Sequence, residues 1–219
     1  MATRPDACIY FGFDRAVTKE EFRAAVERSE TDPEIMTSFV NRVPVQTGDV
    51  FYVSAGVIHA IGAGCLILEV QEPTDFTIQP EYWCGDYHLN AQEMYLGLDA
   101  DTALDCFDYT QSGAAVAERG RKQPRVLHEE NGVRVEQLIG PEDTECFSMT
   151  RYLLDGGSVS LTEPASVWIC VDGAGELTGE NYTRPIAKGD YFFLPAAAAG
   201  KITANSDKTL KIVCCMGGK

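Results

Sequence analysis

The stretch that decides the fold is GDVFYVSAGVIHAIGAGCLILEVQ, which runs from Gly48 to Gln71. Its two apolar runs, Val50–Val53 and Cys65–Val70, are rich in β-branched and aromatic residues, which favour strands. The glycine-rich residues 62–64 predict a tight reversal, because glycine adopts positive φ without strain. We expect the ring of His59 to project from a short strand into the space that the sheet encloses.

A lone histidine beside an apolar strand is more often a buried core residue than a metal ligand. Here the spacing favours the ligand, because it follows the second half of the cupin metal-binding pattern through Gly48, Ser54, Gly56 and His59. Ser54 stands where proline is usual. A histidine held between close-packed strands suits a metal ion, since its neighbours fix both the rotamer and the tautomer.

The longer stretch GDVFYVSAGVIHAIGAGCLILEVQEPTDFT, residues 48–77, resembles the metal-binding strand pair of the class I mannose-6-phosphate isomerases. A looser similarity continues to the C-terminus. The resemblance implies a zinc-dependent aldose–ketose isomerase that interconverts mannose 6-phosphate and fructose 6-phosphate through a cis-enediol. It implies that His59 is a zinc ligand and that the small-molecule partner is a sugar phosphate.

The chain departs from this family at Gln79, where the best-known members have an arginine that assists proton transfer or holds the substrate. Glutamine keeps the hydrogen-bonding capacity but loses the fixed positive charge. The chain is then either a variant with another electrostatic helper or a protein that has lost catalysis. Glu72, with Asp75 and Glu81 nearby, is a candidate general base or a partner that orients His59. Turn and rim carboxylates on an acidic protein are the favoured interpretation of all three.

The composition of the chain limits the partners and the cellular compartment that we expect for it. The chain has 219 residues and a net charge of −15, which argues against nucleic-acid or anionic-membrane partners. Its first residues lack an apolar signal core, and no apolar run reaches the length of a membrane span. Its eight cysteines show no paired spacing, so we expect free thiols in a reducing compartment and a cytoplasmic location.

The N-terminal part of the sequence predicts a first cupin unit that is incomplete at its N-terminus. Ala7–Phe13 reads as a core strand with no partner before it, whereas in the family a preceding region supplies a glutamine–histidine pair and a glutamate to the metal. The chain therefore resembles the later part of an isomerase, either as a truncated piece or as a natural short form. Thr18 and Glu21 form a capping box for a helix over Thr18–Glu30, followed by a second short helix over 33–40. An open jelly roll exposes strand edges, so we expect homodimers or swapped strands.

A second β unit follows a connecting segment, in which Asp101 can cap a short helix through Phe107 and residues 111–122 read as a polar loop. Basic residues gather at the end of that segment, where they are either a phosphate pocket or, as we favour, solvated charges: Arg119, Arg121, Lys122 and Arg125. Five strands separated by turn signals then predict a jelly roll: Val133–Leu138, Cys146–Leu154, Val167–Val171, Tyr191–Leu194 and Leu210–Cys215. The run from Gly189 to Pro195 repeats the Gly48–Ser54 pattern, and the slot of His59 falls on Gly200, which has no ligand atom.

The predicted fold is mainly β, with two cupin or jelly-roll units, the first incomplete at its N-terminus, and a small helical insertion. We expect a partial first cupin over 1–90 with the insertion near 18–41, a connecting segment over 91–123, and a degenerate second cupin over 124–219. One ligand cannot hold catalytic zinc, which normally takes three protein donors, so the isolated chain should be impaired. The alternative function is a non-catalytic cupin module that binds or supports a separate N-terminal part.

Overall fold

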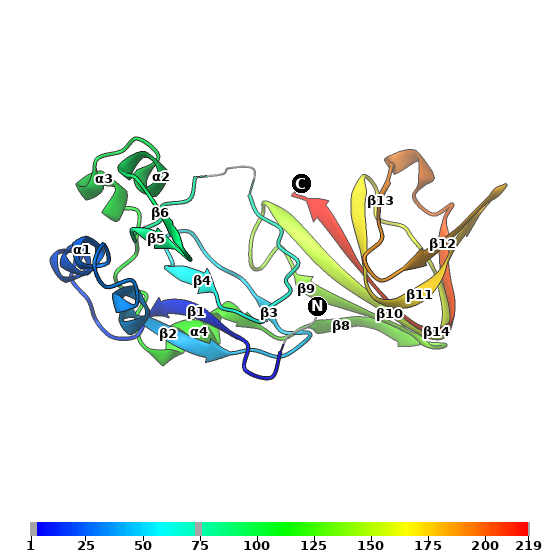
Figure 1. The fold of residues 1–219 in the computed structure, drawn as a ribbon. Helices are drawn as coiled ribbons and strands as arrows, with labels where there is room; N and C mark the ends of the chain where they lie inside the picture. The colour runs from blue at the N-terminus through cyan, green and yellow to red at the C-terminus, as the bar shows by residue number, and fades with distance from the viewer. Residues whose placement is uncertain (1–3, 73–75, 219) are drawn as a thin grey trace. The chain divides into compact units, whose positions relative to one another are not determined.

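The computed structural model describes residues 4–72 and 76–218, and the chain divides into two compact units. The N-terminal unit holds the residues up to 67 together with 76–121. The C-terminal unit holds 68–72 and the residues from 122 onward. Strands dominate the chain as a whole, as predicted, and the α-helices gather in the N-terminal unit (Figure 1).

The N-terminal unit is built on a three-stranded antiparallel sheet. Its central strand is β1 (Cys8–Phe13), with β2 (Val40–Pro44) on one side and β4 (His59–Ile61) on the other. Five of the six residues of β1 are buried, which explains its dense apolar sequence. Both partners of this strand come later in the chain, so β1 is paired on both sides although no partner strand precedes it.

Four further short strands pair in this part of the chain, and one predicted strand does not form. β3 (Val50–Phe51) pairs with β7 (Arg121–Lys122), at which the chain leaves the unit, and β5 (Trp83–Cys84) pairs with β6 (Tyr87–His88). The predicted strand Cys65–Val70 has only a bridge at its first residue and is otherwise irregular. An apolar run becomes a strand only where a ladder partner lies beside it, and none of the four sheets includes this run.

The predicted helical insertion is present. Helix α1 (Lys19–Arg28) starts at the capping box, in which Thr18 accepts from the Glu21 amide and the Glu21 carboxylate accepts from the Thr18 amide. The second helix is the 3-10 helix η1 (Ile35–Phe39). Phe22 of α1 is fully buried and meets the ring of Phe13 edge-on at 5.1 Å, which fixes α1 against the sheet.

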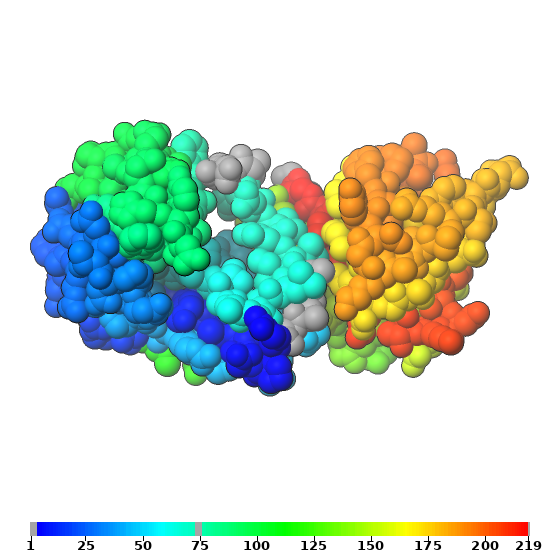
Figure 2. Space-filling view, viewed as in Figure 1, coloured from blue at the N-terminus to red at the C-terminus, as the bar shows by residue number. Residues whose placement is uncertain are grey.

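The segment 91–123, expected to be a connection with one short helix from Asp101, supplies three helices to the N-terminal unit. They are α2 (Ala91–Tyr95), α3 (Ala100–Leu104) and α4 (Ala114–Gly120). Met94 and Leu104 are fully buried in the same core as α1, so this segment belongs to the fold of the unit. Its green residues and the blue residues of α1 form neighbouring parts of the surface (Figure 2).

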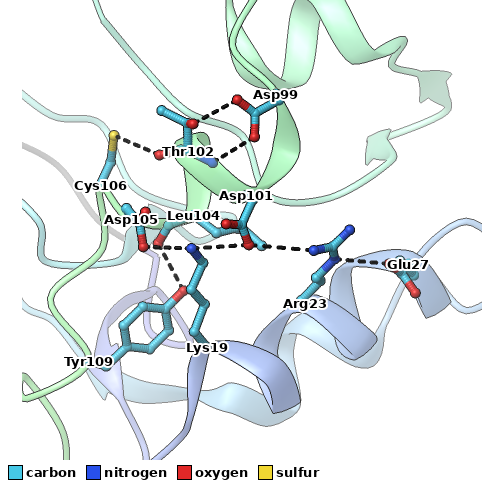
Figure 3. A network of polar contacts seen from close by, with 10 residues as sticks. All are labelled: Lys19, Arg23, Glu27, Asp99, Asp101, Thr102, Leu104, Asp105, Cys106 and Tyr109. Carbon is cyan, nitrogen blue, oxygen red and sulfur yellow. Dashed lines mark hydrogen bonds and ion pairs between the residues drawn. The ribbon is translucent and has the colours of Figure 1, made fainter.

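A polar network on the surface ties α1 to α3 (Figure 3). The Lys19 ammonium lies 2.6 Å from Asp105 and 3.2 Å from Asp101, and these contacts raise the pKa of Lys19, the Asp105 hydrogen bond most strongly. Asp101 also receives the Arg23 guanidinium at 3.5 Å. The carboxylates of this network are exposed, so it orients the two helices and contributes little to stability.

The C-terminal unit is a strongly bent antiparallel sheet with strand order β12-β11-β14-β10-β9-β8, and β13 pairs with β11 outside that order. Its strands are β8 (Arg125–Glu130), β9 (Val133–Ile139), β10 (Phe147–Ser160), β11 (Ser166–Gly179), β12 (Tyr182–Ala187), β13 (Tyr191–Leu194) and β14 (Thr203–Gly217). A 3-10 helix, η2 (Ala196–Ala198), follows β13. All five predicted strands are found, and β8 and β12 are additional.

Glycine bulges bend the three longest strands at one level of the sheet. The β10–β14 register shifts between Asp155 and Gly157, and the β11–β14 register shifts on both sides of Gly173. Gly156 and Gly173 have φ of 68° and 75°, which a side chain would strain. The sequence predicted turns at these glycines, whereas the strands continue through them.

Within residues 4–72 and 76–218, no helix combines the length and apolarity that a bilayer crossing requires.

Candidate functional site

His59 is the first residue of β4, opposite Phe11 of β1. Its Nδ1 lies 2.9 Å from the carbonyl oxygen of Val57. A carbonyl only accepts hydrogen bonds, so Nδ1 must carry the proton and the lone pair of the neutral ring lies on Nε2. A backbone carbonyl on one ring nitrogen is the usual means by which a protein directs the other nitrogen at a metal.

The side chain of His59 is exposed, as are its β4 neighbours Ala60 and Ile61. The described residues of the unit therefore do not enclose the ring, although we expected the sheet to do so. Figure 1 shows β4 beside β1 at the margin of the sheet. An open sheet margin places a histidine where donors from outside the described residues can reach it.

Two hydrogen-bonded turns shape the corner before His59. The Asp49 carboxylate accepts from the Gln46 amide at 2.8 Å, while the Asp49 amide donates to the Gln46 carbonyl at 3.1 Å. After β3, the Val57 amide donates to the Ser54 carbonyl at 3.2 Å. The corner thus holds the Val57 carbonyl where it meets the imidazole.

The C-terminal unit repeats this corner at the predicted positions. The Asp190 carboxylate accepts from the Ala187 amide at 2.7 Å, and the Asp190 amide donates to the Ala187 carbonyl at 2.9 Å. The Ala198 amide donates to the Pro195 carbonyl at 2.9 Å, as Val57 does to Ser54. Gly200 stands at the position equivalent to His59, so the second corner keeps the main-chain geometry of the first but has no side chain that could bind a metal.

Side chains fill the interior of the C-terminal unit. Trp168 is fully buried, stacks on Phe192 with ring centroids 6.1 Å apart, and donates through Nε1 to Ser166 at 2.8 Å. The Tyr152 hydroxyl donates to Glu163, and burial together with this carboxylate raises the pKa of Tyr152. This interior is a packed and hydrogen-bonded core, which agrees with a structural role for the second unit.

A metal site is not complete within the part of the chain that the structure describes. No three histidine, cysteine or acidic side chains come together there to hold a metal ion. His59 offers one suitably oriented donor, whereas catalytic zinc normally takes three. The described residues alone therefore do not fit a resident zinc ion.

The other predicted site residues are spread over the chain. Gln79 is half-buried, and its main-chain N–H donates to the Met94 carbonyl at 2.9 Å. Glu72 is exposed and is grouped with the C-terminal unit. Asp75 lies outside the described residues. Glu81 is half-buried, and burial, with a smaller effect of Glu34, raises its pKa, so its environment disfavours the charged form.

The basic residues near 121 have partners within their own units. Arg121 contacts Asp49, donates to the Pro44 carbonyl at 2.8 Å and lies over the Phe51 ring at 4.6 Å. Lys122 lies 2.7 Å from Asp143. Two further residues bond to glutamine side chains: Arg119 to Gln111 and Arg125 to Gln137. The cluster is therefore a set of structural contacts, whereas the favoured interpretation was solvated charges.

Sequence reasoning missed the residues that support the Gln79 segment. Ser29, at the end of α1, is fully buried; its hydroxyl donates to the Val26 carbonyl at 2.7 Å and accepts from the Tyr82 amide at 3.1 Å. The Trp83 indole donates to the Glu30 carbonyl at 3.0 Å. A serine at a helix end has many common roles, so no signal in the sequence pointed to this contact.

Comparison with known proteins gives a consistent result. Residues 139–216 match the cupin domain of mannose-6-phosphate isomerase. Mannose-6-phosphate isomerase ManA of Bacillus subtilis is 32% identical over 193 residues, which cover 87% of this chain and 55% of the relative. The probable mannose-6-phosphate isomerase GmuF of the same organism is 35% identical over 195 residues, covering 88% of this chain and 56% of the relative.

The solved structure of the mannose 6-phosphate isomerase from Bacillus subtilis matches 98% of this chain and 62% of its own, with a TM-score of 0.73 and 22% identity. The chain thus has the cupin fold of that protein and is similar to these isomerases over most of its length. It spans about half the length of the curated relatives it matches.

Proposed function

We propose that this chain, as a cupin protein similar to the mannose-6-phosphate isomerases, forms the histidine-bearing part of an aldose–ketose isomerase acting on mannose 6-phosphate and fructose 6-phosphate. The observation that carries the proposal is the His59 ring, whose Nδ1 is fixed by the Val57 carbonyl so that Nε2 is directed as a ligand. Sequence similarity to ManA supplies the substrate class.

The reaction moves a proton between the first and second carbons of the sugar through a cis-enediol. Zinc, when bound, would supply the Lewis acidity that polarises the oxygens on those carbons. This chain contributes the orientation of His59 and, at the position of the family arginine, the neutral amide of Gln79. A neutral amide donates a hydrogen bond but adds no positive charge, so we expect the chain by itself to be impaired.

Zinc titration of the purified chain tests the role of His59. We expect weak zinc binding that His59→Ala abolishes, since one imidazole is a poor site alone. His128→Ala is the matched control, because it removes another exposed imidazole, which lies beside Glu130 in the other unit. Zinc binding that survives His59→Ala, or that falls equally in both variants, would refute the assignment.

A second candidate is a non-catalytic cupin module that acts with a separate polypeptide. It is favoured by the lack of a three-donor cluster within the described residues and by Gln79 in place of arginine. A coupled assay with mannose 6-phosphate and zinc separates the two candidates. Turnover by the chain alone at the rate of Bacillus subtilis ManA, measured alongside, would exclude the module.

The proposal places the protein in the cytoplasm, where sugar phosphates are metabolised. All eight cysteines are free thiols in the structure, as expected for a reducing compartment. Burial raises the pKa of Cys214 to about 12 and that of Cys170 to about 11, so these two thiols are inert core residues.

A further inference from the structure

Strand β13 is an edge of the C-terminal sheet, and its main chain alternates between a bonded side and an open side. Among the described residues it pairs only with β11, in a register without a shift. Just before the strand, the Cys170 amide donates to the Asp190 carbonyl at 2.8 Å. Antiparallel bonds alternate along a strand, so Phe192 also bonds toward β11, whereas the N–H and C=O groups of Tyr191 and Phe193 point away from it.

The side chains of β13 alternate in the same way between the core and an exposed face. Phe192 stacks on the buried Trp168, and Leu194 is itself buried in the core. Tyr191 and Phe193 lie on the other face, where they are 73% and 61% exposed. The core contacts hold the strand in place, so the open main-chain groups and the two exposed rings form one fixed edge.

The other two edges of this sheet have the features that normally prevent pairing with another chain. β8 carries an arginine and two glutamates, and its register with β9 shifts between Val126 and His128. β12 carries Arg184 and Pro185. Charges, proline and bulges are the usual protection of edge strands. β13, with the sequence YFFL, has no charge, no proline and an unbroken register, so it is the unprotected edge of the sheet.

The open edge of β13 is complementary to a second copy of itself. When Tyr191 of one copy faces Phe193 of the other, the two residues exchange both of their outward main-chain hydrogen bonds. A two-fold axis through Phe192 repeats this pair, so every open N–H and C=O group of Tyr191 and Phe193 gains a partner. The same register places the Tyr191 ring beside the Phe193 ring of the second copy, with about 4.5–5.5 Å between their Cβ atoms, where aromatic pairs form.

Charge does not oppose this pairing, although the chain has a net charge of −15. The first carboxylate before the strand is that of Asp190, which this register places opposite Leu194 of the second copy. The two copies of Asp190 are then four residues apart along the strands, which is about 13 Å at about 3.3 Å per residue. That separation exceeds the Debye length of about 8 Å at physiological ionic strength, so their repulsion is screened.

The aromatic surface of this edge is small for an interface. A fully enclosed aromatic side chain buries about 150–250 Å², and Tyr191 and Phe193 are mostly exposed in the free chain. Pairing two copies therefore removes roughly 500 Å² of ring surface from water. Stable complexes bury about 1,200–2,000 Å² in total, so a dimer formed through this edge is weak and depends on protein concentration.

We infer that β13 is the contact of a weak, reversible dimer of this chain, in which one continuous sheet runs through two antiparallel copies of β13. Tyr191 of each copy pairs with Phe193 of the other, and the two-fold axis passes through Phe192. The dissociation constant is roughly 10–100 μM, as expected for an interface of this size. The inference rests on the C-terminal unit and does not depend on the isomerase activity.

Sedimentation velocity over a series of protein concentrations tests the dimer. Phe193→Lys removes a ring from each cross-strand pair and adds a charge to the open edge, so the dissociation constant should rise by roughly tenfold or more. The matched control is Tyr182→Lys, which changes an aromatic residue of β12 that is 41% exposed and should leave the dissociation constant unchanged. Urea unfolding of both variants should match the wild type, which shows that they are folded.

Opposite charges test the register. A chain with lysine at both 191 and 193 should stay monomeric, as should a chain with glutamate at both positions. An equal mixture of the two should dimerise, because each lysine then faces a glutamate across the paired strands. In the wild-type chain, amide hydrogen exchange at Tyr191 and Phe193 should slow as the protein concentration rises, while exchange at Phe192, which already bonds to β11, should not change.

Four results would each overturn the inference. They are a wild-type chain that stays monomeric up to about 1 mM, a Phe193→Lys chain that dimerises as well as the wild type, a Tyr182→Lys chain that is weakened equally, and a mixture of the lysine and glutamate chains that does not associate.

Discussion

Ser29 gives the sharpest test of how the helical insertion supports the segment that carries Gln79. In Ser29→Ala the Tyr82 amide loses its acceptor in a fully buried place, and the Val26 carbonyl loses a donor. A buried group left without its partner costs about 1–3 kcal/mol, so we expect the free energy of unfolding to fall by about 2 kcal/mol. That is a roughly 30-fold change in the ratio of folded to unfolded protein.

The matched control is Ser38→Ala. The Ser38 hydroxyl donates to the Ile35 carbonyl at 2.7 Å, but the residue is exposed, so water replaces the lost contact and the change should stay within about 0.5 kcal/mol. The assay is urea unfolding followed by Trp83 fluorescence in a Trp168→Phe background, because each unit contains one of the two tryptophans. Equal effects of the two alanine variants, or unchanged hydrogen exchange at the Tyr82 amide, would refute the reasoning.

Three further predictions follow from the contacts described. Gln79→Arg should raise the isomerase rate of the chain by about tenfold or more in the coupled assay, and an unchanged rate would remove Gln79 from the site. Burial by itself would raise the pKa of Glu136, but Arg151 and Arg134 outweigh it and lower that pKa. The stability that the Glu136 carboxylate contributes is therefore present above the ordinary pKa of 4.5 and is lost as pH falls through the lowered value. Glu136→Gln should lower the free energy of unfolding by about 3 kcal/mol at pH 7 and flatten this acid dependence in urea titrations. Thr18→Ala should cost about 1 kcal/mol by removing the capping box, and urea unfolding that shows no loss would count against this role.

Much of the fold follows from local sequence, and the errors have a common cause. The capping box at Thr18 and the strand Tyr191–Leu194 were predicted closely, because each depends on neighbouring residues. The glycine pair Gly156-Gly157 and the glycine at 173 predicted turns, yet they are bulges that let β10 and β11 continue around a bend. A bulge and a turn use the same residues, and only the partner strand distinguishes them.

The helices between 91 and 120 show a second limit. Residues 111–122 read as a polar loop because only Val116 and the alanines are apolar. In the structure Val116 is buried beside β1, and Gly120 lies so close to the Phe11 ring that an added Cβ would come within 2.4 Å of it. These contacts join residues far apart in sequence, so no local pattern contains them.

Only those features of the candidate site that depend on neighbouring residues in the sequence could be predicted. The spacing that ends at His59 gave its position on a short strand, and the second corner was found at Gly189–Pro195 as expected. That the ring is exposed could not be foreseen, because it depends on which strands surround β4. The assignments of Gln79, Glu72 and His59 to chemistry remain predictions.

The paired corners bear on how such a chain can evolve. In both units the bend is set by an aspartate and by main-chain bonds, and the residue in the following slot takes no part in those bonds. The residue in that slot can therefore differ between the two copies, His59 in one and Gly200 in the other, without disturbing the bonds that set the bend. The main-chain bonds of the hairpin preserve the shape of the corner, and the side chain in the following slot alone decides whether an imidazole is present there.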